Sequence, residues 1–207
     1  MKREEKAKKI LKILNELFPK PEIPLTHRDP YTFLIAVILS QQCTDARVNQ
    51  ITPLLFEKAK TPKEMVKLGE KKIEDLIRPV GLAKTKARNI YELSKILVSS
   101  YDSEVPKSFD ELLALPGVGR KTASVLVSQA FGEDAFAVDT HIHRLAKRWG
   151  LTRGKNREET ENDLKAAFPK KTWSQVHLQM IYFGRSYCPA RNHNPADCPI
   201  CSWAMEK

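Results

Sequence analysis

Apolar residues recur along most of this chain at the three- and four-residue spacing that is typical of amphipathic helices. In the first 18 residues, leucines and isoleucines mark one face while lysines fill the other. Residues 31–40 are apolar nearly all round, which predicts a buried helix that Asp29 caps and Pro30 begins. No segment alternates as a strand does, and no repeat of solenoid length is visible. The pattern therefore predicts an all-α protein of many short helices.

Two cap signals predict where further helices begin. We expect Asp45 to cap one helix, and Thr61, followed by Pro62 and Glu64, to cap another. The remaining helices are expected over residues 1–18, 72–77, 84–99, 108–114, 121–131, 139–149, 158–168 and 173–187. Short connections between them are typical of a compact helical protein.

Length and composition limit the class of protein. The chain has 207 residues, enough for one large or two small domains with a real core. Its longest apolar run, Phe33 to Leu39, is too short to span a bilayer, and no signal peptide is visible. We expect a cytoplasmic, nucleoid-associated monomer without membrane contact. A net charge of +10 favours a polyanionic partner such as nucleic acid, and general solubility is the alternative explanation.

A glycine turn, Leu-Pro-Gly-Val-Gly at 115–119, separates two expected helices and leads into Arg120 and Lys121. Glycine lets a ligand approach the main chain, and the next helix offers backbone N–H groups and a positive dipole end to an anion. Together with the basic charge, this pattern predicts that the turn binds a DNA phosphate. A plain turn between helices is the alternative interpretation.

Lys121 and Asp139 are the candidate chemical groups. An amine nucleophile suits an aldehydic or acetal-like carbon. A carboxylate can accept the proton of the amine or stabilise positive charge on a sugar ring. The alternative roles are a solvated surface lysine and an N-cap of the helix that follows Asp139. Capping and catalysis are compatible, because a capping carboxylate is held rigid.

Two runs of residues resemble a known family: Leu-Pro-Gly-Val-Gly-Arg-Lys-Thr-Ala at 115–123 and Ala-Val-Asp-Thr-His at 137–141. Both are similar to endonuclease III in the helix-hairpin-helix DNA glycosylase superfamily. Segments 39–45, 81–90 and 177–188 extend the likeness over nearly the whole chain. The resemblance implies a two-lobed helical DNA glycosylase fold.

The resemblance also implies how the chain divides. A helical barrel domain would cover residues 24–132 and include the helix-hairpin-helix at about 111–131. Residues 1–23 and 133–207 would form the second helical lobe, with a Cys-containing C-terminal loop.

The activity that the resemblance implies is a bifunctional DNA glycosylase and abasic-site lyase. Such an enzyme removes oxidised pyrimidines from damaged duplex DNA in base excision repair. Lys121 would attack the sugar C1′, and β-elimination through the Schiff base would cut the strand, with Asp139 as the essential carboxylate. Gln42 and Leu82 match positions that fill the gap left by a flipped nucleotide. The implied DNA contacts are Gln42, Leu82, Leu115, Gly117, Val118, Gly119, Arg120, Thr122 and His141.

Two other functions stay open. A non-catalytic module that binds DNA by its structure would need neither Lys121 nor Asp139. An adenine-type glycosylase without lyase action resembles this chain, but it lacks the lysine and carries an added C-terminal domain.

Three of the four cysteines, Cys188, Cys198 and Cys201, lie within the last 20 residues, which favours a metal site over disulfides. Members of the resembled family carry four cysteines there, which hold a [4Fe–4S] cluster. Here the fourth is absent, and His193 is the candidate replacement. The set predicts a cluster, with zinc or no metal as alternatives. We expect Cys43 to be a core residue or pocket wall on the buried helix.

Overall fold

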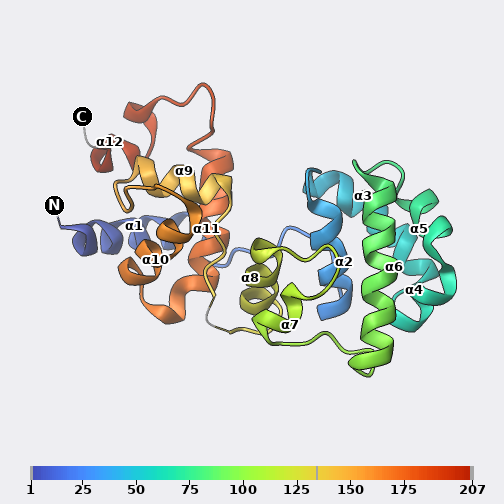
Figure 1. The fold of residues 1–207 in the computed structure, drawn as a ribbon. Coiled ribbons are helices and arrows are strands. Elements are labelled where there is room, and N and C mark those ends of the chain that lie inside the picture. Colours follow the sequence, from blue (N-terminus) through green and yellow to red (C-terminus); the bar gives the residue numbers. More distant parts are fainter. Residues whose placement is uncertain (1, 134, 206–207) are drawn as a thin grey trace. The chain divides into compact units, whose positions relative to one another are not determined.

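The computed structural model describes residues 2–133 and 135–205, and its regular structure there is entirely helical (Figure 1). The prediction of an all-α protein is therefore confirmed. The elements are α1 (Arg3–Leu17), α2 (Pro30–Ser40), α3 (Asp45–Lys58), α4 (Pro62–Leu68), α5 (Glu70–Ile77), α6 (Ala83–Ser100), α7 (Phe109–Leu113), α8 (Arg120–Gln129), α9 (Thr140–Arg148), α10 (Arg157–Ala167), η1 (Lys170–Thr172), α11 (Trp173–Ser186), η2 (Pro195–Asp197) and α12 (Cys201–Ala204). Among the described residues, no helix is both long enough and apolar enough to cross a bilayer.

The chain forms two compact units. Unit 1 combines Met1–Glu22 with Gly132–Lys207, and unit 2 is the continuous segment Ile23–Phe131. Helix α2 is the centre of unit 2, because every side chain from Tyr31 to Leu39 is buried. Around it pack α3, α6 and α8, all within the same unit. This all-round burial explains why α2 has no polar face in the sequence.

Side chains begin several of these helices, mostly at the expected residues. Asp29 and Thr61 each form a capping box at the start of α2 and α4, as predicted. The prediction that Asp45 caps α3 is wrong. Thr44 is the cap, since its hydroxyl accepts a hydrogen bond from the Arg47 backbone N–H at 3.3 Å. Asp45 is the first helical residue, where its negative charge suits the helix dipole.

Unit 1 has its own hydrophobic core, built by α1, α9, α10 and α11. Its largest fully buried side chains are Trp149, Phe136 and Phe183. The segment 188–204 packs into the same core. Lys6 on α1 is buried and donates a hydrogen bond to the Ala204 carbonyl oxygen at 3.1 Å. The beginning and the end of the described chain are therefore joined inside this unit.

Candidate active site and metal centre

Helices α7 and α8 and the turn between them form a helix-hairpin-helix in unit 2 (Figure 1). Gly117 has a φ of +79°, and a Cβ there would lie 2.9 Å from the Cβ of Asn89, so the turn requires glycine. Gly119 is the N-cap of α8 and has an ordinary φ of −92°. A Cβ at Gly119 would meet no atom within 4 Å. The exposed start of α8 therefore suits an anion.

The basic residues behind the turn are exposed, whereas several of the expected contact residues are not. Arg120 and Lys121 lie in the first turn of α8, and the Arg120 guanidinium is 5.5 Å from the centre of the Phe109 ring. Burial restricts the side chains of Leu115, Val118 and Thr122. Any contact of these three with DNA would thus involve mainly their backbone atoms.

Asp139 in unit 1 is the N-cap of α9. Its Oδ1 accepts hydrogen bonds from the backbone N–H groups of His141 and Ile142, both at 2.8 Å, and the residue is 9% exposed. The backbone two residues before Asp139 is also held, because His177 Nδ1 lies 2.9 Å from the Ala137 carbonyl oxygen. The carboxylate is thus rigidly held, as the capping alternative requires and as a catalytic role permits.

Gln42 and Leu82, the two candidate gap-filling residues, share an unusual backbone. Their φ values are +54° and +62°, in the left-handed region that residues other than glycine rarely adopt. Leu82 is also 57% exposed, although its side chain is large and apolar. A Cβ at Gly81 would lie 3.8 Å from the Gln42 carbonyl oxygen, so the two loops are neighbours. Strained residues with exposed side chains are typical of functional sites.

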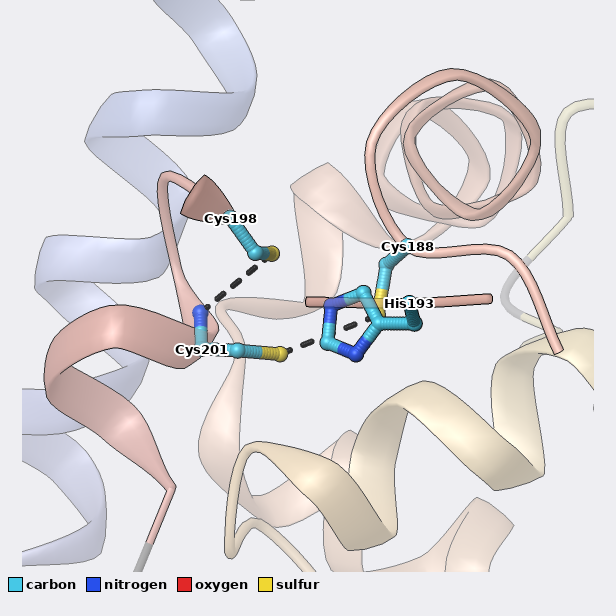
Figure 2. Close-up of side chains that lie close together, drawn as sticks. All are labelled: Cys188, His193, Cys198 and Cys201. Atoms are coloured by element: carbon cyan, nitrogen blue, oxygen red, sulfur yellow. Dashed lines mark hydrogen bonds between the residues drawn. The ribbon is translucent and has the colours of Figure 1, made fainter. Parts of the chain in front are cut away.

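The structure brings together the four predicted metal ligands in unit 1. Figure 2 shows Cys188, His193, Cys198 and Cys201, whose ligand atoms all lie within 4.8 Å of one another. The three cysteines are buried, and Nε2 of His193 is buried without a hydrogen-bond partner. An orphaned buried nitrogen beside three thiols fits a metal centre, because thiolate and imidazole bind both iron–sulfur clusters and zinc.

Two arginines of α9 surround the first cysteine. Nη1 of Arg148 lies 3.1 Å from Cys188 Sγ and donates to the Pro189 carbonyl oxygen at 2.7 Å. Arg144 Nη2 donates to the Cys188 carbonyl oxygen at 3.1 Å. A hydrogen bond with Cys201, assisted by Arg148, lowers the pKa of Cys188 to about 5, although burial opposes this shift. Cys188 is therefore ready to serve as a thiolate, the form that binds metals.

Three further candidates are His141, His143 and Cys43. His141 is exposed on α9, and His143 Nδ1 lies 2.8 Å from Thr160 Oγ1. The prediction that Cys43 lies on the buried helix is wrong, because α2 ends before it. Cys43 is partly exposed in the turn that precedes α3.

Sequence reasoning gave no site role to four residues that organise these sites: Gln41, Lys86, Arg144 and Arg148. Gln41 Nε2 donates to the Gly117 carbonyl oxygen at 2.9 Å and so joins the α2 loop to the hairpin. Arg148 could have been found, because it lies one turn after Arg144 on the helix that follows Asp139. Lys86 carries no signal that separates it from the many other lysines.

Comparison with known proteins gives consistent matches. The family model described as "HhH-GPD superfamily base excision DNA repair protein" matches residues 35–170. Endonuclease III of Bacillus subtilis is 44% identical over 93% of this chain and 89% of its own length. Endonuclease III of Escherichia coli K12 is 41% identical over 94% of this chain and 93% of its own length.

Solved structures agree with these relatives. A non-covalent endonuclease III–DNA complex matches with a TM-score of 0.93 and 43% identity, covering 100% of this chain and 96% of the other. A trapped endonuclease III–DNA covalent intermediate matches with a TM-score of 0.91 and 45% identity, covering 97% and 94%. The findings identify a DNA glycosylase and abasic-site lyase of base excision repair: the chain belongs to the endonuclease III family of the HhH-GPD superfamily.

Proposed function

We propose that this enzyme removes oxidised pyrimidines from duplex DNA, with Lys121 as its nucleophile and Asp139 as the essential carboxylate. One observation carries the proposal: an exposed lysine lies in the first turn of α8, directly behind the exposed Gly119 cap. A DNA phosphate bound at that helix start brings its deoxyribose to the turn that holds the amine. The similar solved structures include a trapped covalent complex of endonuclease III with DNA.

The proposed reaction has two stages. The neutral amine of Lys121 attacks C1′, the glycosidic bond breaks, and the base leaves with the bonding electron pair and takes a proton from solvent. Asp139 takes up the proton of the amine or balances positive charge on the sugar. The sugar ring then opens to the Schiff base. Loss of a proton from C2′ expels the 3′ phosphate, which cuts the strand on the 3′ side.

Borohydride trapping on a duplex with an abasic site tests the nucleophile. Borohydride reduces a Schiff base, so the wild-type enzyme is expected to form a stable covalent adduct, and Lys121→Ala is expected to form none. Lys95→Ala is the matched control, because Lys95 is exposed and pairs with Glu92 on α6. An undiminished adduct in Lys121→Ala would reject Lys121 as nucleophile.

The same assay separates the rival functions. A non-catalytic DNA-binding module would bind the duplex but give no adduct with wild-type protein. Base-release assays on duplexes that hold an oxidised pyrimidine or a mispaired adenine then test the substrate. Release of the adenine in preference to the pyrimidine would favour the adenine-type reading.

We propose further that Cys188, Cys198, Cys201 and His193 hold a [4Fe–4S] cluster. Histidine ligands on cluster iron are known from Rieske centres. When bound, the cluster would cross-link the segment 188–201 and supply a redox couple. Zinc is the second candidate, because Cys188 Sγ and Cys201 Sγ lie 3.7 Å apart. Two thiolates on one tetrahedral zinc, with bonds of about 2.3 Å, are separated by roughly 3.8 Å.

Metal analysis of the purified protein decides between these candidates. A cluster gives iron and acid-labile sulfide in equal amounts and absorbs visible light, whereas zinc gives neither signal. His193→Ala is expected to lose metal, and His193→Cys, which restores a four-cysteine set, is expected to retain it. Full metal content in His193→Ala would show that His193 is not a ligand.

A further inference from the structure

Lys86 on α6 is a buried ammonium with well-defined partners in unit 2. The residue is 3% exposed, and its Nζ donates to the carbonyl oxygens of Leu39 at 2.8 Å and Gln41 at 2.6 Å. A buried charge is unfavourable unless hydrogen bonds compensate it. Burial accordingly lowers the pKa of Lys86.

The charge of Lys86 stabilises the end of α2 but is unfavourable near the start of its own helix, α6. The residue lies just past the first turn of α6, where the positive end of the dipole disfavours a cation. Its side chain instead reaches the last carbonyl groups of α2, which attract a cation. The ammonium thus fixes the end of α2, from which the Gln42 loop continues.

Lys86 lies one helical turn after the second loop. Its backbone N–H makes the regular first-turn hydrogen bond of α6 to the Leu82 carbonyl oxygen at 2.9 Å, which any residue except proline would make. The Lys86 side chain therefore links the loop of Gln42 to the helix that begins directly after Leu82. The central residues of the two loops, Gln42 and Leu82, have φ values of +54° and +62°.

We propose that Lys86 is a positioning residue for nucleotide flipping, which holds Gln42 and Leu82 side by side in their left-handed conformations. The inference rests on the proposed function and on the expectation, from the family resemblance, that these two side chains fill the gap left by the flipped nucleotide. Gln41, whose carbonyl oxygen accepts from Lys86, donates its own side chain to Gly117 of the hairpin. Lys86 therefore also sets where the gap-filling loops lie relative to the phosphate-binding turn.

A fluorescence assay tests this role without requiring catalysis. A 2-aminopurine base is placed opposite a non-reactive abasic-site analogue in a duplex, where unstacking of that base raises its emission. The wild-type enzyme is expected to raise the emission on binding. Lys86→Met, which keeps length but removes the ammonium, is expected to lose most of this rise and to keep its affinity for undamaged duplex. Lys95→Met removes an exposed charge from the same helix and is expected to behave as wild type.

Single-turnover base release supplies the second readout. Lys86→Met is expected to slow release of a paired oxidised pyrimidine about tenfold, because flipping from a stacked pair needs the wedges. Release of the same lesion from an unpaired bubble is expected to stay within about twofold of wild type, because little stacking is left to break. In the Gln42→Ala/Leu82→Ala background, Lys86→Met is expected to cause no further loss.

Distinct outcomes overturn distinct claims. Equal slowing on paired and unpaired lesions would show that Lys86 supports the fold only, and wild-type behaviour on both would reject any role. A normal fluorescence rise without base release by the wild type would reject the proposed function and leave the positioning role standing. If circular dichroism shows that Lys86→Met is unfolded, Lys86→Arg replaces it. That variant keeps the positive charge, but its guanidinium is larger than the ammonium and cannot keep the same geometry with both carbonyl oxygens. The same selective loss on paired lesions is therefore expected.

Discussion

Leu82 has a large exposed apolar side chain and a left-handed backbone. The backbone conformation lowers stability, whereas the side chain is expected to serve activity. Leu82→Gly relieves the backbone strain, so we expect the free energy of unfolding to rise by about 0.5–1 kcal/mol. The same change removes the wedge, so release of a paired lesion is expected to slow. Thermal unfolding and single-turnover kinetics measure the two effects.

Asp102 provides the matched control for this exchange, because it is exposed in unit 2 with a φ of +49°. Asp102→Gly is expected to stabilise the protein less, because aspartate tolerates the left-handed region better than leucine does, and to leave the kinetics unchanged. A Leu82→Gly enzyme that is more stable and equally fast would exclude Leu82 from flipping.

Asp139 has a structural and a proposed chemical role, and two substitutions separate them. Asp139→Asn retains a side-chain oxygen that can accept from the α9 N–H groups, so stability is expected to change little. Asp139→Ala removes the cap and is expected to cost about 1 kcal/mol. Both variants are expected to lose most base release but to bind DNA. An active Asp139→Asn enzyme would reduce Asp139 to a helix cap.

At the residue scale, the sequence predicts identities better than conformations. The chain neighbours of Lys121 and Asp139 mark them as candidates, the clustering of three cysteines predicts a metal site, and His193 is a candidate because it lies between Cys188 and Cys198. The left-handed backbones at Gln42 and Leu82 could not be predicted, because glutamine and leucine rarely adopt them. The Gln42 loop is held by a hydrogen bond between Lys86 and the Gln41 carbonyl oxygen, and these two residues are far apart in the sequence.

In the hairpin, Gly117 is required by the backbone conformation, whereas Gly119 is expected to leave room for a phosphate. Gly117→Ala would place a Cβ 2.9 Å from Asn89 at a φ of +79°, so we expect a stability loss of roughly 1–3 kcal/mol. Gly119→Ala meets open space, so stability is expected to stay within about 0.5 kcal/mol. DNA affinity is nevertheless expected to fall, because the new methyl group would face the bound phosphate.

Thermal unfolding and fluorescence anisotropy with duplex DNA test this pair of glycines. An unstable Gly119→Ala variant, or one with unchanged affinity, would contradict the phosphate-binding role of the turn.

Long helices were predictable, and so were the short helices α4, α5 and α7, but the shortest elements were not. Helices α1, α2 and α6 have enough turns for their apolar spacing to be clear, and their expected positions agree with the structure. The short elements η2 and α12 span too few residues for any period. The packing of Cys198, Cys201 and their neighbours into the unit 1 core determines where these elements lie.

At the scale of the whole molecule, the metal site belongs to one unit alone. Its three cysteines lie in the core of unit 1, whereas α2 forms the centre of unit 2. Removal of the metal is therefore expected to speed amide exchange in residues 188–204 and adjoining unit 1 helices by about tenfold or more. Exchange in α2 and α6 is expected to stay unchanged, as hydrogen-exchange mass spectrometry can show. A uniform increase over both units would mean that the two cores unfold together.

The hydrogen bond between Lys6 and Ala204 has a consequence for biosynthesis. Helix α1 is synthesised before the groups that cover its apolar face, because these groups come from residues beyond Gly132. At translation rates of about 5–20 residues per second, α1 is complete roughly 10–40 s before the segment 188–204. Unit 2 is continuous and can fold during that interval. During synthesis, α1 therefore keeps its apolar face uncovered while the whole of unit 2 is made.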